Sequence, residues 1–445
     1  MIRLHVLALS LFVSISAAGQ VITQIENYTA RNYASLASLY QKLHQFPELS
    51  LQEKKTSAIM AQELKQLGFE VIENIGGYSL AGVFVNGDGP TVLIRTDMDA
   101  LPLKETTGLP YASQEHGINA AGQDVSIMHA CGHDIHMTVF IGTARALVAH
   151  KKNWHGTLVM VAQASEENGM GAAQMFKGGL YEKIPTPDYA LALHDNATLA
   201  AGKIGYNTGA FMASVDMMDI TVFGKGGHGA APHTTVDPIV LSAQMIMAFQ
   251  TIVSREINPL EPAVITVGSI HGGTVHNIIP DQVKMQLTLR SYSSAVREQI
   301  LTAIKKKSHH LAALAGVPED KMPAISIVEP TIPATINDKA LTTSIVNVFQ
   351  QTFGTELVEE ISSSMVGEDF SRFALQGKDV PICMFWLGAA DPEEVKRSKE
   401  NGTILPQLHT ANFKPLVEPT IKTGVKAMCA AVLHIFKEDP KEKHK

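Results

Sequence analysis

The chain contains few cysteines, and their number limits its architecture. Its 445 residues include only three, Cys131, Cys383 and Cys429. A low, odd count argues against a small domain built on disulfide bonds. Cys383 and Cys429 could pair with each other, but both lie in apolar stretches, PICMFWLG and AMCAAVL, which favour two buried thiols.

The chain also lacks an excess of positive charge. Lysine and arginine together number 36, against 43 aspartates and glutamates, for a net charge of -7. This balance excludes nucleic acid as an expected partner. Hydrophobic residues make up 45% of the sequence, which suffices for a large core, and the length predicts two domains.

Long apolar runs are absent except at the N-terminus. Arg3 is followed by an apolar run over residues 6–15 and by small residues over 16–19. This order is typical of a secretory signal peptide, predicted here over residues 1–19 with cleavage after Ala18 or Gly19. The run is too short to anchor the chain in a membrane, so we expect an exported protein, periplasmic or secreted, that is free of the membrane after signal removal. The alternative is a buried N-terminal helix.

Hydrophobic periodicity predicts an α/β-layered catalytic domain with a central, mostly parallel sheet. Residues 27–68 follow a helical pattern, and three strands, EVIENI, SLAGVFV and PTVLIRT, come after them. An irregular stretch over 97–128 precedes a helix at 133–150 and the apolar strand GTLVMVAQ. A short helix and the strand DYALALH complete this part.

The pattern changes near residue 210. Strand, helix, strand, strand, helix and strand then follow in about a hundred residues, the order of a ferredoxin-like (split β-α-β) unit. The α/β alternation resumes afterwards with the strand VPICMFWLG and a helix over 416–436. We therefore expect a discontinuous catalytic domain over 27–209 and 327–436, an inserted domain over 210–326, and a charged tail over 437–445.

The motif HACGHD places several possible metal ligands within six residues. It holds His129, Cys131, His133 and Asp134 just before a predicted helix. Thiolate and imidazole are good ligands for zinc and similar divalent metals. The alternative is a reduced cysteine beside surface histidines. An exposed free thiol is a liability in an exported protein, which favours a liganded one.

Two adjacent acids, Glu166 and Glu167, follow the buried strand GTLVMVAQ. Active sites of open α/β sheets lie where such strands open into loops. One carboxylate could bind a metal while its neighbour acts as a base, with the metal offsetting their mutual repulsion. A solvated pair of loop carboxylates is the alternative.

Two further histidines extend the candidate site. His194 ends the strand DYALALH, and His409 lies far along the chain in PQLHTANF. Either alone could be a structural or surface histidine. Taken together, the candidate ligands are more numerous than the four of a closed structural site. They point to two metals that share a bridging group. These ligands are Cys131, His133, Glu167, His194 and His409.

The motifs resemble a known family when taken in order. LHQFPELS, TDMDALP, HACGHD, the glutamate pair, ALH, GKGGHGAAPH, NIIPD and LHTANF all occur in sequence. Together they are similar to the amidohydrolase branch of the aminoacylase/carboxypeptidase metallopeptidase superfamily. This branch includes hippurate hydrolases, N-acyl-L-amino-acid amidohydrolases and plant auxin-conjugate hydrolases. The resemblance covers roughly residues 27–436.

The resemblance implies a role for each matching position. The same five ligands would hold two divalent metal ions per subunit, zinc or manganese, with cobalt or nickel as alternatives. Glu166 would be the general base, and Asp99 would orient the catalytic site. The inserted domain would be a lid that also forms a homodimer. His228 of the lid would reach across that dimer to the substrate carbonyl, and Asn277 and Arg290 would hold the substrate carboxylate.

The resulting expectation is a metal-dependent hydrolase that cleaves the amide bond of a small N-acyl amino acid, hippurate-like or a related conjugate. Two alternatives remain open. One is a dipeptidase or carboxypeptidase of the same superfamily that acts on a peptide-like substrate. The other is a non-catalytic binding protein on the same fold.

Overall fold

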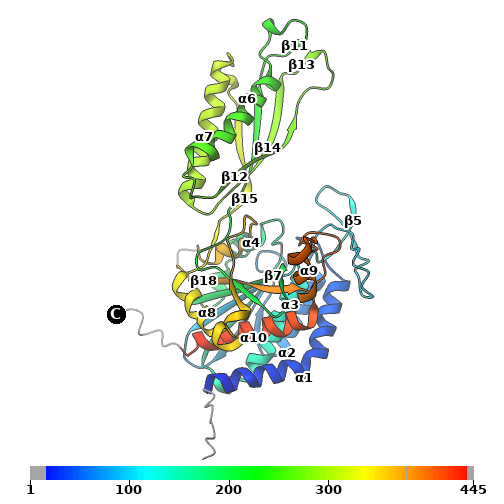
Figure 1. Ribbon diagram of the computed structural model, residues 1–445, viewed down its shortest axis with the longest axis vertical. Coiled ribbons are helices and arrows are strands. Elements are labelled where there is room, and N and C mark those ends of the chain that lie inside the picture. Colours follow the sequence, from blue (N-terminus) through cyan, green and yellow to red (C-terminus); the bar gives the residue numbers. More distant parts are fainter. Residues whose placement is uncertain (1–16, 376–378, 438–445) are drawn as a thin grey trace, which may run out of the picture.

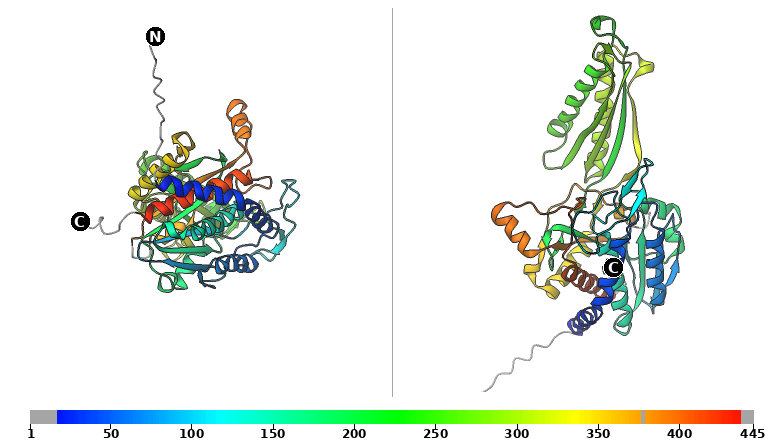
Figure 2. Two further views of the ribbon diagram at one scale, coloured as in Figure 1. Left: turned by 90° about the horizontal axis from the view of Figure 1, so that it is seen from below. Right: turned by 90° about the vertical axis from the view of Figure 1, so that its right-hand side faces the viewer.

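A computed structural model describes residues 17–375 and 379–437. Most of the predicted signal peptide and nearly all of the charged tail lie outside the described residues. The chain forms a large body around an eight-stranded sheet and a smaller one around a four-stranded sheet, which stands apart from the first (Figures 1 and 2). No helix in the described part of the chain is long and apolar enough to cross a membrane.

The eight-stranded sheet is mixed but parallel at its centre. β3 pairs in parallel with β6 and β7, and β7 pairs in parallel with β18. β1, β2 and β6 are joined by antiparallel pairs at one edge, while β8 is antiparallel to β18 and parallel to β17 at the other. The order is β1 (Glu70–Ile72), β2 (Leu80–Asn86), β6 (Gly156–Gln163), β3 (Thr91–Asp97), β7 (Tyr189–Ala200), β18 (Ile382–Ala390), β8 (Ile204–Tyr206), β17 (Val358–Glu360). This arrangement confirms the predicted fold class.

Helices cover both faces of this sheet, as its apolar central strands require. One face packs on α1 (Ala17–Gln45), α2 (Lys54–Gln66), α3 (His133–Ala149), α8 (Lys339–Phe353) and α10 (Val417–Ile435). α1 and α10, from opposite ends of the chain, lie side by side (Figure 2). The other face packs on α4 (Gly171–Lys177), α5 (Leu180–Lys183) and the 3-10 turn η6 (Asp369–Phe373). The short helix α9 (Pro392–Asn401) lies outside these layers, near β7.

Two expected segments differ from the structure. The helical pattern over 27–68 is two helices, because Pro47 disfavours helical backbone at the residue before it and α1 ends at Gln45. Residues 46–53 connect them through a turn at 50–51, where Leu51 has a left-handed backbone with φ of 68°. The irregular stretch over 97–128 contains a hairpin of β4 (His116–Ile118) and β5 (Asp124–Ser126).

The smaller body has the order expected of the inserted unit. Its antiparallel strands lie in the order β12 (Ala263–His271), β14 (Gln282–Ser291), β10 (Val215–Phe223), β15 (Ala324–Ile332). α6 (Pro238–Thr251) and α7 (Ser294–Leu314) pack on this sheet around a separate apolar core. A small two-stranded antiparallel sheet, formed by β11 (Gly227–His228) and β13 (Ile278–Ile279), lies at its far end (Figure 1). The domain boundaries at 209/210 and 326/327 stay predictions.

The two bodies are joined at short connections. β9 (Ala210–Met212) pairs with β16 (Thr335–Ile336) where the chain leaves the large body and returns to it. Beside this pair, the Ser214 amide donates to the carbonyl oxygen of Ser291, and their hydroxyls lie 3.1 Å apart.

Candidate metal centre and its surroundings

The turn before α3 brings Cys131 and His133 to the same place. Gly132 between them has a left-handed backbone, with φ of 73°. A Cβ at this position would lie 2.2 Å from a carboxylate oxygen of Asp195. Only glycine fits there, so the HACGHD turn can approach β7 closely enough to place its ligands against His194.

Hydrogen bonds fix the orientation of two histidine rings. Nδ1 of His133 lies 2.8 Å from the carbonyl oxygen of Asp99, and Nδ1 of His194 lies 2.8 Å from that of Asp195. A carbonyl oxygen only accepts, so each Nδ1 carries the proton and donates. In the neutral ring each Nε2 then keeps a lone pair, the arrangement common among metal-binding histidines.

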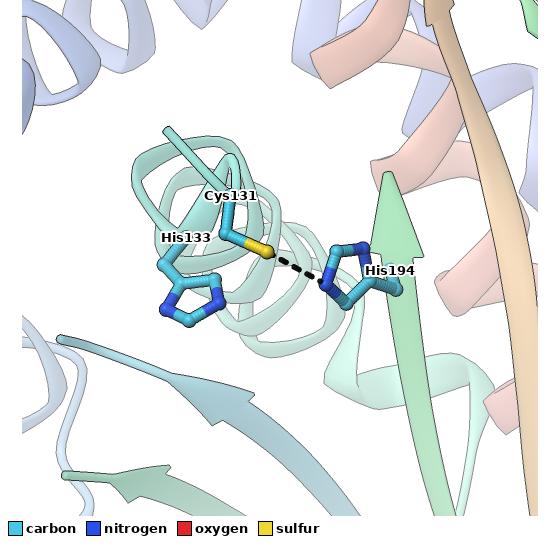
Figure 3. Close-up of side chains that lie close together, drawn as sticks. All are labelled: Cys131, His133 and His194. Carbon is cyan, nitrogen blue, oxygen red and sulfur yellow. Dashed lines mark hydrogen bonds between the residues drawn. The ribbon is translucent and has the colours of Figure 1, made fainter. Parts of the chain in front are cut away.

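The candidate ligands converge although they come from distant segments. Cys131 Sγ lies 3.5 Å from Nε2 of His194, which extends from β7 (Figure 3). His409 Nε2 lies 3.1 Å from Cys131 Sγ and 3.4 Å from a carboxylate oxygen of Glu167. His133 Nε2 lies 3.8 Å from the other Glu167 oxygen. His194 lies within β7 rather than at its end, because this strand continues to Ala200.

The donor set fits a pair of divalent cations. Two overlapping triplets have ligand atoms within 4.8 Å of one another and share the thiol of Cys131: one adds His133 and His194, the other Glu167 and His409. His133 Nε2 and Glu167 Oε1 are buried and lack a hydrogen-bond partner among the described residues. Buried polar atoms without partners are costly unless a ligand satisfies them. Thiol, imidazole and carboxylate donors together suit zinc and related ions.

The electrostatics of the cluster also favour a cation. Burial raises the pKa of the Cys131 thiol well above its usual range, and the Glu167 carboxylate adds to the rise. Burial likewise raises the pKa of Glu167 to about 7, although His133 opposes the shift. Burial would lower the pKa of His133, but Asp97 and Asp99 raise it well above its usual range. A divalent ion would favour the ionised thiol and carboxylate that bind it.

Glu166 lies beside this cluster. A carboxylate oxygen of Glu166 lies within 4.8 Å of a ligand atom of His133 and of a carboxylate oxygen of Glu167. Burial raises the pKa of Glu166 well above its usual range, and the carboxylates of Glu368 and Glu167 raise it further. A carboxyl group that holds a proton near neutral pH is suited to acid-base work.

Asp99 fixes the backbone that carries both glutamates. Its two carboxylate oxygens accept the amide protons of Glu166 and Glu167 at 3.1 and 3.0 Å. Its carbonyl oxygen accepts from His133, so one residue contacts three members of the site. The orienting function of Asp99 stays a prediction.

A buried ionic network that the sequence did not reveal adjoins the metal-ligand cluster. Arg95 contacts the carboxylates of Asp97, Glu368 and Asp369 at 2.7, 3.0 and 3.2 Å, and its side chain is fully buried. Its Nε donates to Gln163. The charged residue in the apolar strand PTVLIRT and the acidic pair in VGEDF were the available signals.

A second residue that the sequence did not reveal is His136, which connects α3 to β3 and β7. His136, one turn into α3, lies between Asp97 Oδ1 at 2.7 Å and Asp195 Oδ1 at 3.1 Å. Burial would lower the pKa of His136, but the two carboxylates raise it to about 9. The signal was the third histidine of HACGHDIH, at helical spacing from the second, His133.

The lid residues divide into two groups. His228 on β11 and Asn277 just before β13 are exposed neighbours at the β11–β13 sheet, where the Gly229 amide donates to the Asn277 carbonyl oxygen. This small sheet forms the far end of the smaller body (Figure 1). Arg290 lies half-buried on β14, beside the Gly367 backbone. Within one chain, His228 and Asn277 are therefore separated from Arg290 and from the metal-ligand cluster.

All three cysteines are free and buried in the described part of the chain. Cys383 and Cys429 are thus two separate thiols in the core, as their apolar surroundings favoured.

Comparisons with known proteins identify the family. Residues 93–438 match "Peptidase family M20/M25/M40". Thermostable carboxypeptidase 1 of Saccharolobus solfataricus is 33% identical, with 88% of this chain and 93% of that protein covered. N-acetyldiaminopimelate deacetylase of Limosilactobacillus fermentum is 34% identical, with 90% and 97% covered.

Solved structures agree with this assignment. The YXEP protein of Bacillus subtilis, described as a dinuclear metal-binding peptidase of the M20 family, superposes with a TM-score of 0.71. It is 26% identical, and the match covers 91% of this chain and 98% of that one. The chain therefore belongs to peptidase family M20/M25/M40, in the amidohydrolase branch that its motifs resemble, and is a metal-dependent hydrolase.

Proposed function

We propose that this protein hydrolyses the amide bond of small N-acyl amino acids, such as hippurate-like compounds or related conjugates. Two divalent ions, zinc or manganese, with cobalt or nickel as alternatives, would be held by the five ligands named above. The observation that carries the proposal is the convergence of buried, unpartnered ligand atoms with Glu166. A non-catalytic binding protein would have no need for a half-buried, protonatable carboxyl group beside such a cluster.

The chemistry can be assigned to residues of this chain. When bound, the two ions would acidify a water molecule and polarise the amide carbonyl. Glu166 would accept a proton from the attacking water and deliver it to the departing amine nitrogen. The raised pKa of its carboxyl group favours holding that proton between the two steps.

The lid would complete the site from a second subunit. His228 would stabilise the charge that develops on the substrate carbonyl oxygen, an interaction worth about 3 kcal/mol in comparable sites. The partner's Asn277 and the chain's own Arg290, which lie apart within one chain, would bind the substrate carboxylate from the two subunits. The separation of the β11–β13 sheet from the cluster of its own chain supports a homodimer, in which the β11–β13 sheet of the partner subunit reaches over the site.

A peptide-cleaving activity is the second candidate. The relative from Saccharolobus solfataricus is named a carboxypeptidase, and its similarity covers nearly the same share of this chain as that of the deacetylase. Both reactions cleave an amide next to a free carboxylate, so the two candidates differ in the group on the other side of the bond.

We also propose that the chain is exported. The order of Arg3, the apolar run and the small residues over 16–19 supports a signal peptide. N-terminal sequencing of the protein recovered from outside the cytoplasm checks this. A mature start near Gln20 is expected, and an intact Met1 would contradict it.

The decisive experiment is a substrate panel with controlled metal content. The purified chain is freed of metal and reloaded with zinc, manganese, cobalt or nickel, and hydrolysis is followed for N-acetyl and N-benzoyl amino acids and for dipeptides. We expect metal-dependent hydrolysis that favours the N-acyl amino acids. Faster cleavage of dipeptides would establish the second candidate, and failure on all substrates with metal bound would point to a binding protein.

A further inference from the structure

The segment that carries Glu166 and Glu167 is held by side chains rather than by the sheet. β6 ends at Gln163, and each of the next four amides donates to a side-chain oxygen. The acceptors, for residues 164 to 167 in turn, are Ser79 Oγ at 2.9 Å, Glu53 Oε1 at 2.7 Å, Asp99 Oδ1 at 3.1 Å and Asp99 Oδ2 at 3.0 Å. Two carboxylates, those of Glu53 and Asp99, thus fix three consecutive amides at the site.

Ser165, which precedes the pair, has an unusual backbone conformation. Its φ is 60°, in the left-handed region, which costs about 1–2 kcal/mol for a residue other than glycine. The Ser165 hydroxyl donates to Glu53 Oε1 at 3.1 Å and accepts from the Leu51 amide at 2.8 Å. Such a conformation persists only where its surroundings enforce it, and here Glu53 accepts from both the amide and the hydroxyl of Ser165.

Burial of the Glu53 side chain is energetically unfavourable. It is completely buried, and its second oxygen, Oε2, has no hydrogen-bond partner among the described residues. It immediately precedes α2, where a side-chain oxygen commonly accepts from the first helical amides, yet it makes no such bond. The carboxylate is directed at Ser165 instead.

The same connection between α1 and α2 also supports Asp99. The hydroxyl of Ser50 donates to Asp99 Oδ2 at 2.6 Å. Ser50, the last residue of the LHQFPELS motif, therefore contacts Asp99, and Glu53, three residues later, contacts Ser165. The proposed chemistry gave this motif no task.

We propose that Glu53 is a positioning residue that sets the orientation of the base Glu166 and the ligand Glu167 through Ser165, as the counterpart of Asp99. This inference rests on the proposed function, because it assigns those two parts to the glutamates. It predicts that removal of the Glu53 carboxylate misplaces the pair without unfolding the chain.

The test compares Glu53→Ala with Glu53→Gln in the full chain. Glutamine keeps an oxygen that can accept both Ser165 bonds, whereas alanine removes it. We expect Glu53→Ala to lower kcat by about a hundredfold, the scale of effect of a misplacement of about 1 Å, with KM little changed and the chain still folded. Glu53→Gln should restore most of kcat. If Glu53→Ala lowers only the melting temperature and leaves kcat per folded, metal-loaded chain intact, the positioning function is refuted.

Ser165 provides a second, independent variant pair. Ser165→Gly and Ser165→Ala both remove the hydroxyl, but only glycine adopts the left-handed backbone without penalty. We expect the alanine variant to lose more kcat than the glycine variant. Asn74, at φ of 60° on an exposed turn, is the matched control, and Asn74→Ala should leave kcat unchanged. Equal kcat for Ser165→Ala and Ser165→Gly would contradict the proposal.

A spectroscopic measurement separates this inference from the proposed function. Cobalt(II) is titrated into the metal-free wild type and Glu53 variants, and its visible absorption reports the ligand geometry. We expect Glu53→Ala to change the spectrum and weaken binding, and Glu53→Gln to resemble the wild type. This readout needs no substrate, so it tests positioning even if every N-acyl amino acid proves inert. Identical spectra for Glu53→Ala and the wild type would overturn the inference.

Discussion

Nε2 of His409 lies 3.1 Å from Sγ of Cys131, although 278 residues separate them in the chain. The contact links the end of the catalytic body to the HACGHD turn, and the backbone supports it, because the His409 amide donates to the carbonyl oxygen of Ala130. Cys131 also belongs to both candidate ligand triplets. We therefore predict that Cys131→Ala impairs both metal positions and that His409→Ala impairs mainly one.

Metal content per chain, measured after reloading and gel filtration, checks this prediction. Cys383→Ala is the control, because Cys383 is a buried thiol in β18 outside these triplets. It should retain full metal content. A Cys131→Ala chain that still binds two ions tightly would exclude the thiol as a shared ligand.

Glu166→Gln should separate catalysis from metal binding. Glutamine has nearly the same shape but cannot take up the proton of the attacking water. We expect kcat to fall by about 10²–10⁴, the usual contribution of a general base, with metal content unchanged. Steady-state kinetics and metal analysis on the same sample give both quantities. Near-normal turnover would assign the base to another group.

The buried Arg95 should be a main determinant of stability. Arg95→Met keeps the apolar part of the side chain but leaves the carboxylates of Asp97, Glu368 and Asp369 without their cation. Breaking such a buried network typically costs about 3–5 kcal/mol, so the urea midpoint should fall markedly. Arg145→Met is the control, because the Arg145–Glu63 pair is partly exposed and should contribute about 1 kcal/mol or less. Equal losses for the two variants would contradict a special contribution from Arg95.

Stability should depend on pH through His44. Its ring contacts Asp134 at 2.7 Å and Glu105 at 3.1 Å. Burial alone would lower the pKa of His44, but the hydrogen bonds to Asp134 and Glu105 raise it to about 9. The folded-state pKa lies above the unfolded value of about 6.5, so the stabilisation is complete below pH 6.5 and is lost as the pH rises through 9.

The variant His44→Gln isolates this effect. The difference in unfolding free energy between wild type and variant should be largest near pH 6 and shrink by at most about 3 kcal/mol toward pH 10, since one pKa unit corresponds to about 1.4 kcal/mol. Urea unfolding at a series of pH values measures it. A difference that does not change with pH would mean that His44 is neutral in the folded chain.

The sequence predicted those features that depend on local pattern or on ligand chemistry. Apolar runs such as GTLVMVAQ and VPICMFWLG identify strands buried on both faces, and the structure places them as β6 and β18. The thiol and histidines of the metal cluster were recognisable because few other residue types bind divalent metals. The alternation of helices and strands revealed the ferredoxin-like unit.

The missed features depend on contacts between distant segments. Arg95 and Glu368 are 273 residues apart, and although a charge in an apolar strand and an acidic pair are each unusual, neither local sequence identifies the other as its partner. Likewise, the bond of Glu53 to Ser165 joins residues 112 positions apart. From local sequence alone, a charged residue in a strand or before a helix resembles one that faces solvent, because its buried partner lies far away in the chain.

Mixing two inactive variants tests whether the lid acts across a dimer. His228 lies on β11, in the β11–β13 sheet at the far end of the smaller body, away from the cluster of its own chain (Figure 1). If the β11–β13 sheet of the partner subunit completes the site, His228→Ala and Glu166→Gln chains, each inactive alone, form mixed dimers with one intact site. Random exchange should then restore about a quarter of wild-type activity, because half of the dimers are mixed and each has one working site of two. Mixing Glu166→Gln with His194→Ala is the control, because both residues belong to one catalytic body and no intact site can form. Activity restored in the control as well, or in neither mixture, would refute a site shared between subunits.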